Sequence, residues 1–293
     1  MTAVIGDTAL SSPPLPDRTA HRGRRRRVRV GRGVVLLLAI LYFFGPLGAA
    51  FWFSIDEGNG LTWHAYTHFA QAPGFGSAAT LSLELAALTV VLSLVLMIPT
   101  LLLVHLRFPR VRTAVELLSL LPLVVPPIVL VVGVSTVIGW GNQGSSGSFR
   151  SQLFNQLLNS SPPPILPLEY VILVLPFVFR SLDAGLRTSN TATLVEAARN
   201  LGASWPTTVW RVVLPTLRTS LLNGSFLAFA LVLGEFTMAR LLQYQPFAVW
   251  LLQFGNTDGQ LSVALSLLSL LLTWALLLVM TAVAGRGPRK AVV

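Results

Sequence analysis

Residues 85–106 read LAALTVVLSLVLMIPTLLLVHL and contain no Asp, Glu, Lys or Arg. A helix needs about 20 predominantly apolar residues to cross the hydrocarbon core of a bilayer. Three further stretches without these charged residues are at least as long, at 33–55, 117–149 and 259–285. The sequence therefore predicts a helical protein that crosses a membrane several times.

The composition of the whole chain points the same way. Of its 293 residues, 53% are hydrophobic and only 11% are charged, and the mean hydropathy is +0.70. Ordinary soluble domains carry about 25% charged residues, so a soluble enzyme is excluded. Because the chain has no cysteine, disulfides, thiolate metal sites and cysteine nucleophiles are excluded as well. The four histidines are scattered, and we predict neither a metal centre nor a catalytic residue.

The apolar stretches predict an all-α membrane protein with six spans, placed at 33–55, 79–106, 114–139, 166–186, 215–241 and 260–284. Four prolines interrupt the second and third of these spans: Pro99, Pro122, Pro126 and Pro127. Irregular backbone is tolerated in a membrane where it lines a translocation path, but ordinary helix kinks would fit the prolines equally well. Short surface helices are expected at 61–70 and 149–158. The apolar run 34–53 exceeds the hydrophobic region of a signal peptide, so we expect the first span to be uncleaved.

The basic residues predict the orientation of the chain, because Lys and Arg accumulate in cytoplasmic loops. With both termini in the cytoplasm, 19 of the 21 Lys and Arg residues lie inside, and only Arg150 and Arg240 lie outside. We expect a disordered basic cytoplasmic tail at 1–32, a transmembrane domain at 33–285 and a short cytoplasmic tail at 286–293. The arginines of the first tail lie beside a membrane span, so we expect them to hold it in the lipid bilayer rather than to bind nucleic acid.

The longest basic loop, between spans four and five, contains the signals of a short helix. Thr193 and Glu196 form an S/T-x-x-E capping box, which predicts the start of a helix. Gly202 predicts a left-handed helix terminator about two turns later, and Trp205-Pro206 predicts the start of a second helix.

The first of these helices is predicted to be amphipathic. Leu194, Ala198 and Leu201 share one face. That face could pack against the chain's own spans or the lipid surface, or it could dock into a groove on a soluble partner. The periodicity leaves both interpretations open.

Residues 196–215 resemble the EAA loop in the permease subunits of bacterial ATP-binding-cassette importers, whose pattern is E-A-A-x3-G-x9-I-x-L-P. The identities at the right spacing are Glu196, Ala197, Ala198, Gly202, Leu214 and Pro215. Val212 replaces the isoleucine, which is a conservative departure. The resemblance covers most of residues 33–285. Residues 61–66 and 79–83 are similar to the family's outer helix and its entry into span two, and 233–236 to part of span five in permeases for polyamines, iron and molybdate.

The resemblance implies half of a type I importer channel in the bacterial inner membrane, with the EAA helix as its cytoplasmic coupling helix. Two permease subunits, identical or homologous, would pair. They would engage an ATPase dimer, and an extracytoplasmic solute-binding protein would deliver the solute. This chain has no G-x-x-x-x-G-K-[ST] loop. We therefore expect it to bind no cofactor and not to be an enzyme, with ATP bound and hydrolysed by the partner.

Acidic residues dominate the predicted outer side of the membrane. Six of them stand against Arg150 and Arg240: Asp56, Glu57, Glu84, Glu169, Glu235 and Asp258. This excess favours a small cation, so a polyamine is the first expectation, in the manner of spermidine and putrescine permeases. Iron(III), molybdate or another small solute is the alternative. Glu235 and Glu84 are candidates for a solute path or gate, although Glu235 could instead be an interfacial carboxylate satisfied by Arg240 or by the partner subunit.

The alternative from a different class is a secondary transporter or channel that works without an ATPase. A carboxylate at the middle of the membrane and inverted repeats would favour that class. Neither is evident in the sequence.

Overall fold

The computed structural model describes residues 20–56, 60–142 and 148–284. Within these ranges the chain is helical and forms no β-strand longer than the isolated bridge Asp56–Leu61. The α-helices are α1 (Ala20–Ile55), α2 (His64–His68), α3 (Phe75–Leu106), α4 (Arg112–Leu120), α5 (Pro127–Asn142), α6 (Phe149–Asn159), α7 (Ile165–Thr188), α8 (Thr191–Asn200), α9 (Trp205–Thr208), α10 (Leu214–Thr216), α11 (Arg218–Leu233), α12 (Thr237–Leu241), α13 (Phe247–Phe254) and α14 (Gly259–Ala284). Short 3₁₀ turns occur at Phe69–Gln71, Pro109–Val111 and Leu121–Leu123, and a π turn at Val209–Val213.

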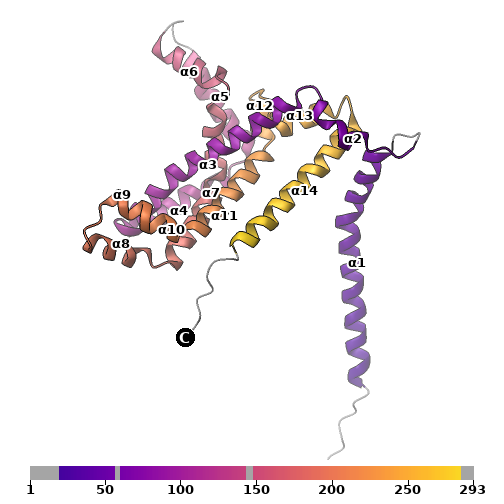
Figure 1. Cartoon of the computed structure of the whole chain (residues 1–293), viewed down its shortest axis with the longest axis horizontal. Helices are drawn as coiled ribbons and strands as arrows, with labels where there is room; N and C mark the ends of the chain where they lie inside the picture. Colours follow the sequence, from indigo (N-terminus) through magenta and orange to yellow (C-terminus); the bar gives the residue numbers. More distant parts are fainter. Residues whose placement is uncertain (1–19, 57–59, 143–147, 285–293) are drawn as a thin grey trace, which may run out of the picture. The chain divides into compact units, whose positions relative to one another are not determined.

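The chain divides into two units, Met1–Trp52 and Phe53–Val293. The first holds most of α1, and the second holds all the helices that follow (Figure 1). Residues 1–19 and 286–293 of the predicted tails lie outside the described residues.

Within the described ranges, four helices are long and apolar enough to cross a membrane: Gly33–Ile55, Phe75–Leu106, Ile165–Thr188 and Arg218–Leu241. A fifth span results if the bent pair Pro109–Leu123 and Pro127–Gly141 is counted as one. The apolar part of α14 within the described residues, Gly259–Ala275, is shorter. The helical membrane fold is therefore confirmed, whereas the sixth span remains a prediction.

The third predicted span differs from the expected continuous helix over 114–139. Its two halves are bent by 99° at a break between Leu123 and Pro127. The reason lies in Pro122, Pro126 and Pro127, because proline donates no backbone N–H and disfavours helical geometry in the residue before it. Of the two interpretations of these prolines, the broken helix is the one observed.

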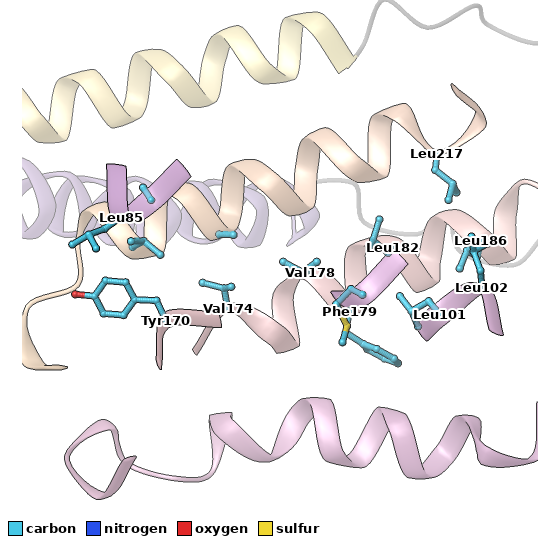
Figure 2. Packing of buried hydrophobic residues seen from close by; sticks show 14 of the residues in the cluster. Leu85, Leu101, Leu102, Tyr170, Val174, Val178, Phe179, Leu182, Leu186 and Leu217 are labelled. Carbon is cyan, nitrogen blue, oxygen red and sulfur yellow. The ribbon is translucent and has the colours of Figure 1, made fainter. Parts of the chain in front are cut away.

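The core of the second unit lies where α3, α7 and α11 pack side by side (Figure 1). Figure 2 shows α7 contributing Val174, Val178 and Leu182 to this core, with Leu85 and Leu101 of α3 beside them. All five side chains are buried. Burial of such side chains contributes about 1.5–3 kcal/mol each in water, but between membrane helices close packing has to supply the attraction.

Small residues allow α7 and α11 to approach closely. A Cβ atom on Gly185 would overlap the side chain of Ser220. Next to this contact, the Ser181 hydroxyl donates a hydrogen bond of 2.7 Å to the backbone oxygen of Ser220. Interhelical contacts between small and hydroxyl residues are typical of membrane helix packing.

The predicted surface helices are confirmed as helices. The segment 61–70 contains α2 and the following 3₁₀ turn, and 149–158 corresponds to α6. Figure 1 shows α2 near α13 and the start of α14, where Trp250 donates a 3.0 Å hydrogen bond to the Pro73 backbone oxygen. An aromatic group surrounds this bond: Phe69, Phe75, Phe247 and Phe254.

Candidate functional site

The corner between α7 and α8 is held by hydrogen bonds. Asn190 turns the chain with a left-handed φ of 45°, which asparagine tolerates better than most residues. The Ser189 hydroxyl donates to the Gly185 backbone oxygen at 2.7 Å and is also hydrogen-bonded to Thr191 at 2.7 Å. Thr191 is buried, with 1% of its surface exposed. The start of α8 is therefore fixed to the end of α7.

The predicted capping box at the start of this helix is wrong. The helix begins at Thr191, and its N-cap position is taken by Asn190, which makes no side-chain cap hydrogen bond. Thr193 and Glu196 are both exposed, and no hydrogen bond joins them in the described part of the chain. Because the bonds of Thr191 begin the helix two residues early, Thr193 falls inside the first turn rather than at the cap.

The predicted end of the helix at Gly202 is confirmed. Gly202 has a φ of +83°, in the left-handed region that favours glycine. Its N–H donates to the Arg199 oxygen, and the Ala203 N–H donates to the Ala198 oxygen, both at 3.0 Å. A Cβ atom at Gly202 would meet nothing within 4 Å. The backbone angle, not a lack of space, is therefore what requires glycine.

The second helix of the loop folds back on the first. Ser204 caps α9 by accepting a hydrogen bond from the Thr207 N–H at 3.4 Å. The π turn that follows packs against α8, and Val195 of α8 and Val213 of the π turn are both buried in the core. Leu214 is half-buried and Pro215 is exposed at the start of α10. The two ends of the EAA pattern therefore belong to one compact unit, the α8–α9 hairpin, which comprises α8, α9, the π turn and α10.

Other apolar side chains of this hairpin remain uncovered. Leu201 is 89% exposed, and Trp210 is 72% exposed. Leu194 is also exposed, as are Glu196 and Ala197, while Ala198 is half-buried. The structure shows the first of the two interpretations of this helix, packing on its own chain, while docking onto a partner stays a prediction. The helix packs on its own chain through Val195 and presents other apolar side chains to its surroundings.

An ion-pair cluster lies near the same end of α7. Arg112, the first residue of α4, donates from Nη2 to both carboxylate oxygens of Asp183, at 2.7 and 2.9 Å. Arg187, one turn along α7, donates from Nε to the same carboxylate at 2.9 Å. The Asp183 side chain is only 12% exposed. The cluster joins the start of α4 to the last turns of α7.

Glu235 occupies the break between α11 and α12. Its carboxylate accepts the Met238 N–H at 2.8 Å and the Ala239 N–H at 3.2 Å. Arg240 is exposed, and the described residues show no ion pair between it and Glu235. The predicted pairing is therefore wrong. The carboxylate instead accepts N–H groups from the first turn of the following helix, α12.

The remaining candidate of the solute path, Glu84, lies apart from this break. It is exposed on α3, and no hydrogen bond joins it to Glu235 among the residues that the structure describes. Glu169 and Tyr170 of α7 instead lie within electrostatic range of Glu235. Both are buried.

Sequence reasoning missed Asn190, Asp183 and Arg112. The polar pair Ser189-Asn190 is a turn signal that could have indicated the corner. Asp183 and Arg112 are 71 residues apart in sequence, and no local pattern links them. Among the described residues, no group of three or more His, Asp or Glu side chains could hold a metal ion.

The fold and this site define a class of protein, a helical membrane protein that offers an exposed helical hairpin at one end of its bundle. Residues 86–286 match the family described as the binding-protein-dependent transport system inner membrane component. The chain belongs to this family and is a permease subunit of an ATP-binding-cassette importer.

Several permeases resemble the chain over most of their length. The molybdenum transport system permease protein ModB of Mycobacterium tuberculosis is 31% identical over 234 residues, which cover 77% of this chain and 85% of the relative. The sulfate transport system permease protein CysW of a Synechocystis species is 30% identical over 207 residues, covering 69% and 70%. A probable molybdenum ABC transporter permease of Haloferax volcanii is 27% identical over 250 residues, covering 78% and 82%.

Proposed function

We propose that this subunit forms half of the translocation path for a small oxyanion, molybdate first and sulfate second. The similarity to permeases named for molybdenum and sulfate transport carries this proposal. It takes up the molybdate alternative of the sequence analysis in place of the polyamine, which these comparisons do not support.

The positions of two of the six acidic side chains, Glu169 and Glu235, agree with this change of solute. The cation expectation rested on acids available at the outer side of the membrane. Glu235 is bonded to two backbone N–H groups, and Glu169 is 2% exposed. Neither carboxylate is presented to a passing solute in this conformation, so the excess of acidic residues loses much of its force.

In the proposed assembly, the hairpin of α8 and α9 docks onto an ATPase subunit. The support is the exposure of Leu201 and Trp210 beside the six EAA identities, because uncovered apolar side chains away from lipid are typical of partner contacts. ATP is bound and hydrolysed in an ATPase dimer. A second permease, identical or homologous, completes the path, and a solute-binding protein delivers the anion.

The proposed orientation places both termini and the α8–α9 hairpin in the cytoplasm, with six spans and α14 as the last. The distribution of Lys and Arg supports it. Membership in an importer family favours ATP-driven import over a secondary transporter or channel that works without an ATPase.

Uptake of labelled molybdate tests the proposed solute. Cells that lack only this subunit should take up much less molybdate than their parent, and the cloned subunit should restore uptake. Excess unlabelled sulfate should compete, whereas excess spermidine should not. Unchanged molybdate and sulfate uptake in the deletion strain would contradict the proposal, and loss of spermidine uptake alone would return the polyamine to first place.

A further inference from the structure

We propose that Asp183 is a positioning residue which holds α4, the end of α7 and the coupling helix α8 together as one moving body. The inference rests on the proposed function in one respect, since α8 has to be the helix on which the ATPase acts. It adds a role for three charged residues outside the EAA pattern: Arg112, Asp183 and Arg187.

The first step is the connection from α8 to Asp183. The Ser189 hydroxyl donates to the backbone oxygen of Gly185 in the last turns of α7, and it accepts the hydroxyl proton of Thr191, both at 2.7 Å. Asp183 lies just before Gly185 on the same helix. A displacement of α8 therefore moves the turn that carries Asp183.

The second step is the connection from Asp183 to α4. Arg112 places one nitrogen between the two oxygens of the Asp183 carboxylate. Hydrogen bonds between ionised groups are shorter and roughly twice as strong as neutral ones. The surroundings are dry enough to preserve this contact, since the Asp183 and Arg112 side chains are 12% and 28% exposed.

The third step is the weakness of other attachments along α4. Leu117 and Leu118 are 65% and 72% exposed, and Ser119 is the buried residue that α4 contributes. The packing of α4 is therefore confined to a face that includes Ser119 and Val115, the latter partly buried against the core. The ion pair at its first residue is therefore well placed to set the position of α4.

The fourth step is what α4 leads to. After α4 the chain enters the break before Pro127 and turns by 99° into α5, which packs against α12. A hinge is where a bundle can change shape while its helices stay intact. Motion of α8 would thus reach this hinge through Asp183 and Arg112.

The test uses the assembled importer in lipid vesicles, with its ATPase and binding protein. The readout is the number of solute molecules transported per ATP hydrolysed. Asp183→Asn and Arg112→Gln should each lower this ratio by about 2- to 30-fold, the range seen for residues that carry coupling. Asp183→Glu, which keeps a carboxylate for both Arg112 and Arg187, should retain most of it. Arg180→Gln, which removes an exposed charge from the same helix, should leave the ratio unchanged.

A second measurement does not depend on the identity of the solute. Because the chain contains no cysteine, spin labels can be attached to single cysteines that replace two exposed residues, Leu118 of α4 and Thr193 of α8. In the wild-type importer their distance should be the same with and without trapped ATP. In Asp183→Asn the distribution should broaden.

A wild-type distance that changes between the two states would overturn the inference, as would unaltered coupling in both single variants. It would also be overturned if an assembled Asp183→Glu importer lost coupling as fully as Asp183→Asn. The spin-label distance can be interpreted even if the importer does not transport molybdate. Failure of the molybdate proposal and failure of this inference are therefore distinguishable.

Discussion

The carboxylate of Glu235 accepts the backbone N–H of Met238 at 2.8 Å, across the break between α11 and α12. This contact joins two helices that the sequence presents as one span. It also occupies the carboxylate of Glu235, which is, from the sequence alone, a candidate for contact with the solute. The geometry supports a structural role for Glu235, which holds the bend between α11 and α12. A Glu235 with this role responds to substitution differently from a carboxylate that binds the solute.

Glu235→Gln should transport at close to the wild-type rate, because the amide oxygen can still accept the Met238 N–H. Glu235→Ala should lower the free energy of unfolding by about 1–3 kcal/mol, the cost of leaving a buried donor without its partner. Thermal unfolding of the purified subunit and solute uptake in vesicles measure these effects. Loss of uptake in Glu235→Gln with normal stability would show that the carboxylate meets the solute after all.

Gly202→Val should weaken the end of α8, because valine has to adopt the φ of +83° that glycine holds. The expected penalty is about 1–2 kcal/mol, the cost of left-handed backbone in residues with a Cβ atom. Association with the ATPase should fall, while insertion into the membrane should not. Gly202→Asn is the matched control, since asparagine accepts this conformation, and it should retain most of the association. Equal behaviour of the two variants would argue against the backbone explanation.

Leu201→Ser separates docking from folding. The side chain is 89% exposed, so the free subunit should unfold as the wild type does. If the ATPase covers it, the loss of about 1.5–3 kcal/mol of burial should weaken association by about 10- to 100-fold. Co-purification of the ATPase with each variant measures this. Unchanged association would remove Leu201 from the contact surface.

Val195→Ala should show the reverse pattern, because Val195 is 5% exposed and belongs to the core. Stability should fall by about 0.8 kcal/mol for each carbon removed. ATPase association should be affected less than in Leu201→Ser when both are compared below their unfolding temperatures.

The sequence predicts this fold where local chemistry decides the structure. Long apolar runs have few alternatives to membrane helices, and the end of α8 follows from the backbone freedom of Gly202. The third span was less predictable, because prolines fit a kink and a 99° break equally well. Asp183 and Arg112 could not be paired, since only the packing of α4 on α7 brings them together. Glu235 was misread because its partners are backbone groups, which no side-chain pattern reveals.

The six-span topology predicts on which side of the membrane each loop lies, and reporter fusions can test this. A periplasmic reporter fused after Gly147 should be active, because 143–147 is expected outside, between the third and fourth spans. The same reporter fused after Ala203 should be inactive, because the α8–α9 hairpin is expected in the cytoplasm with five basic residues of its loop. A cytoplasmic reporter at the two positions should give the opposite pattern and serves as the control. If the Ala203 fusion proves external, the hairpin cannot reach the ATPase, and the proposed coupling surface would have to be abandoned together with the topology.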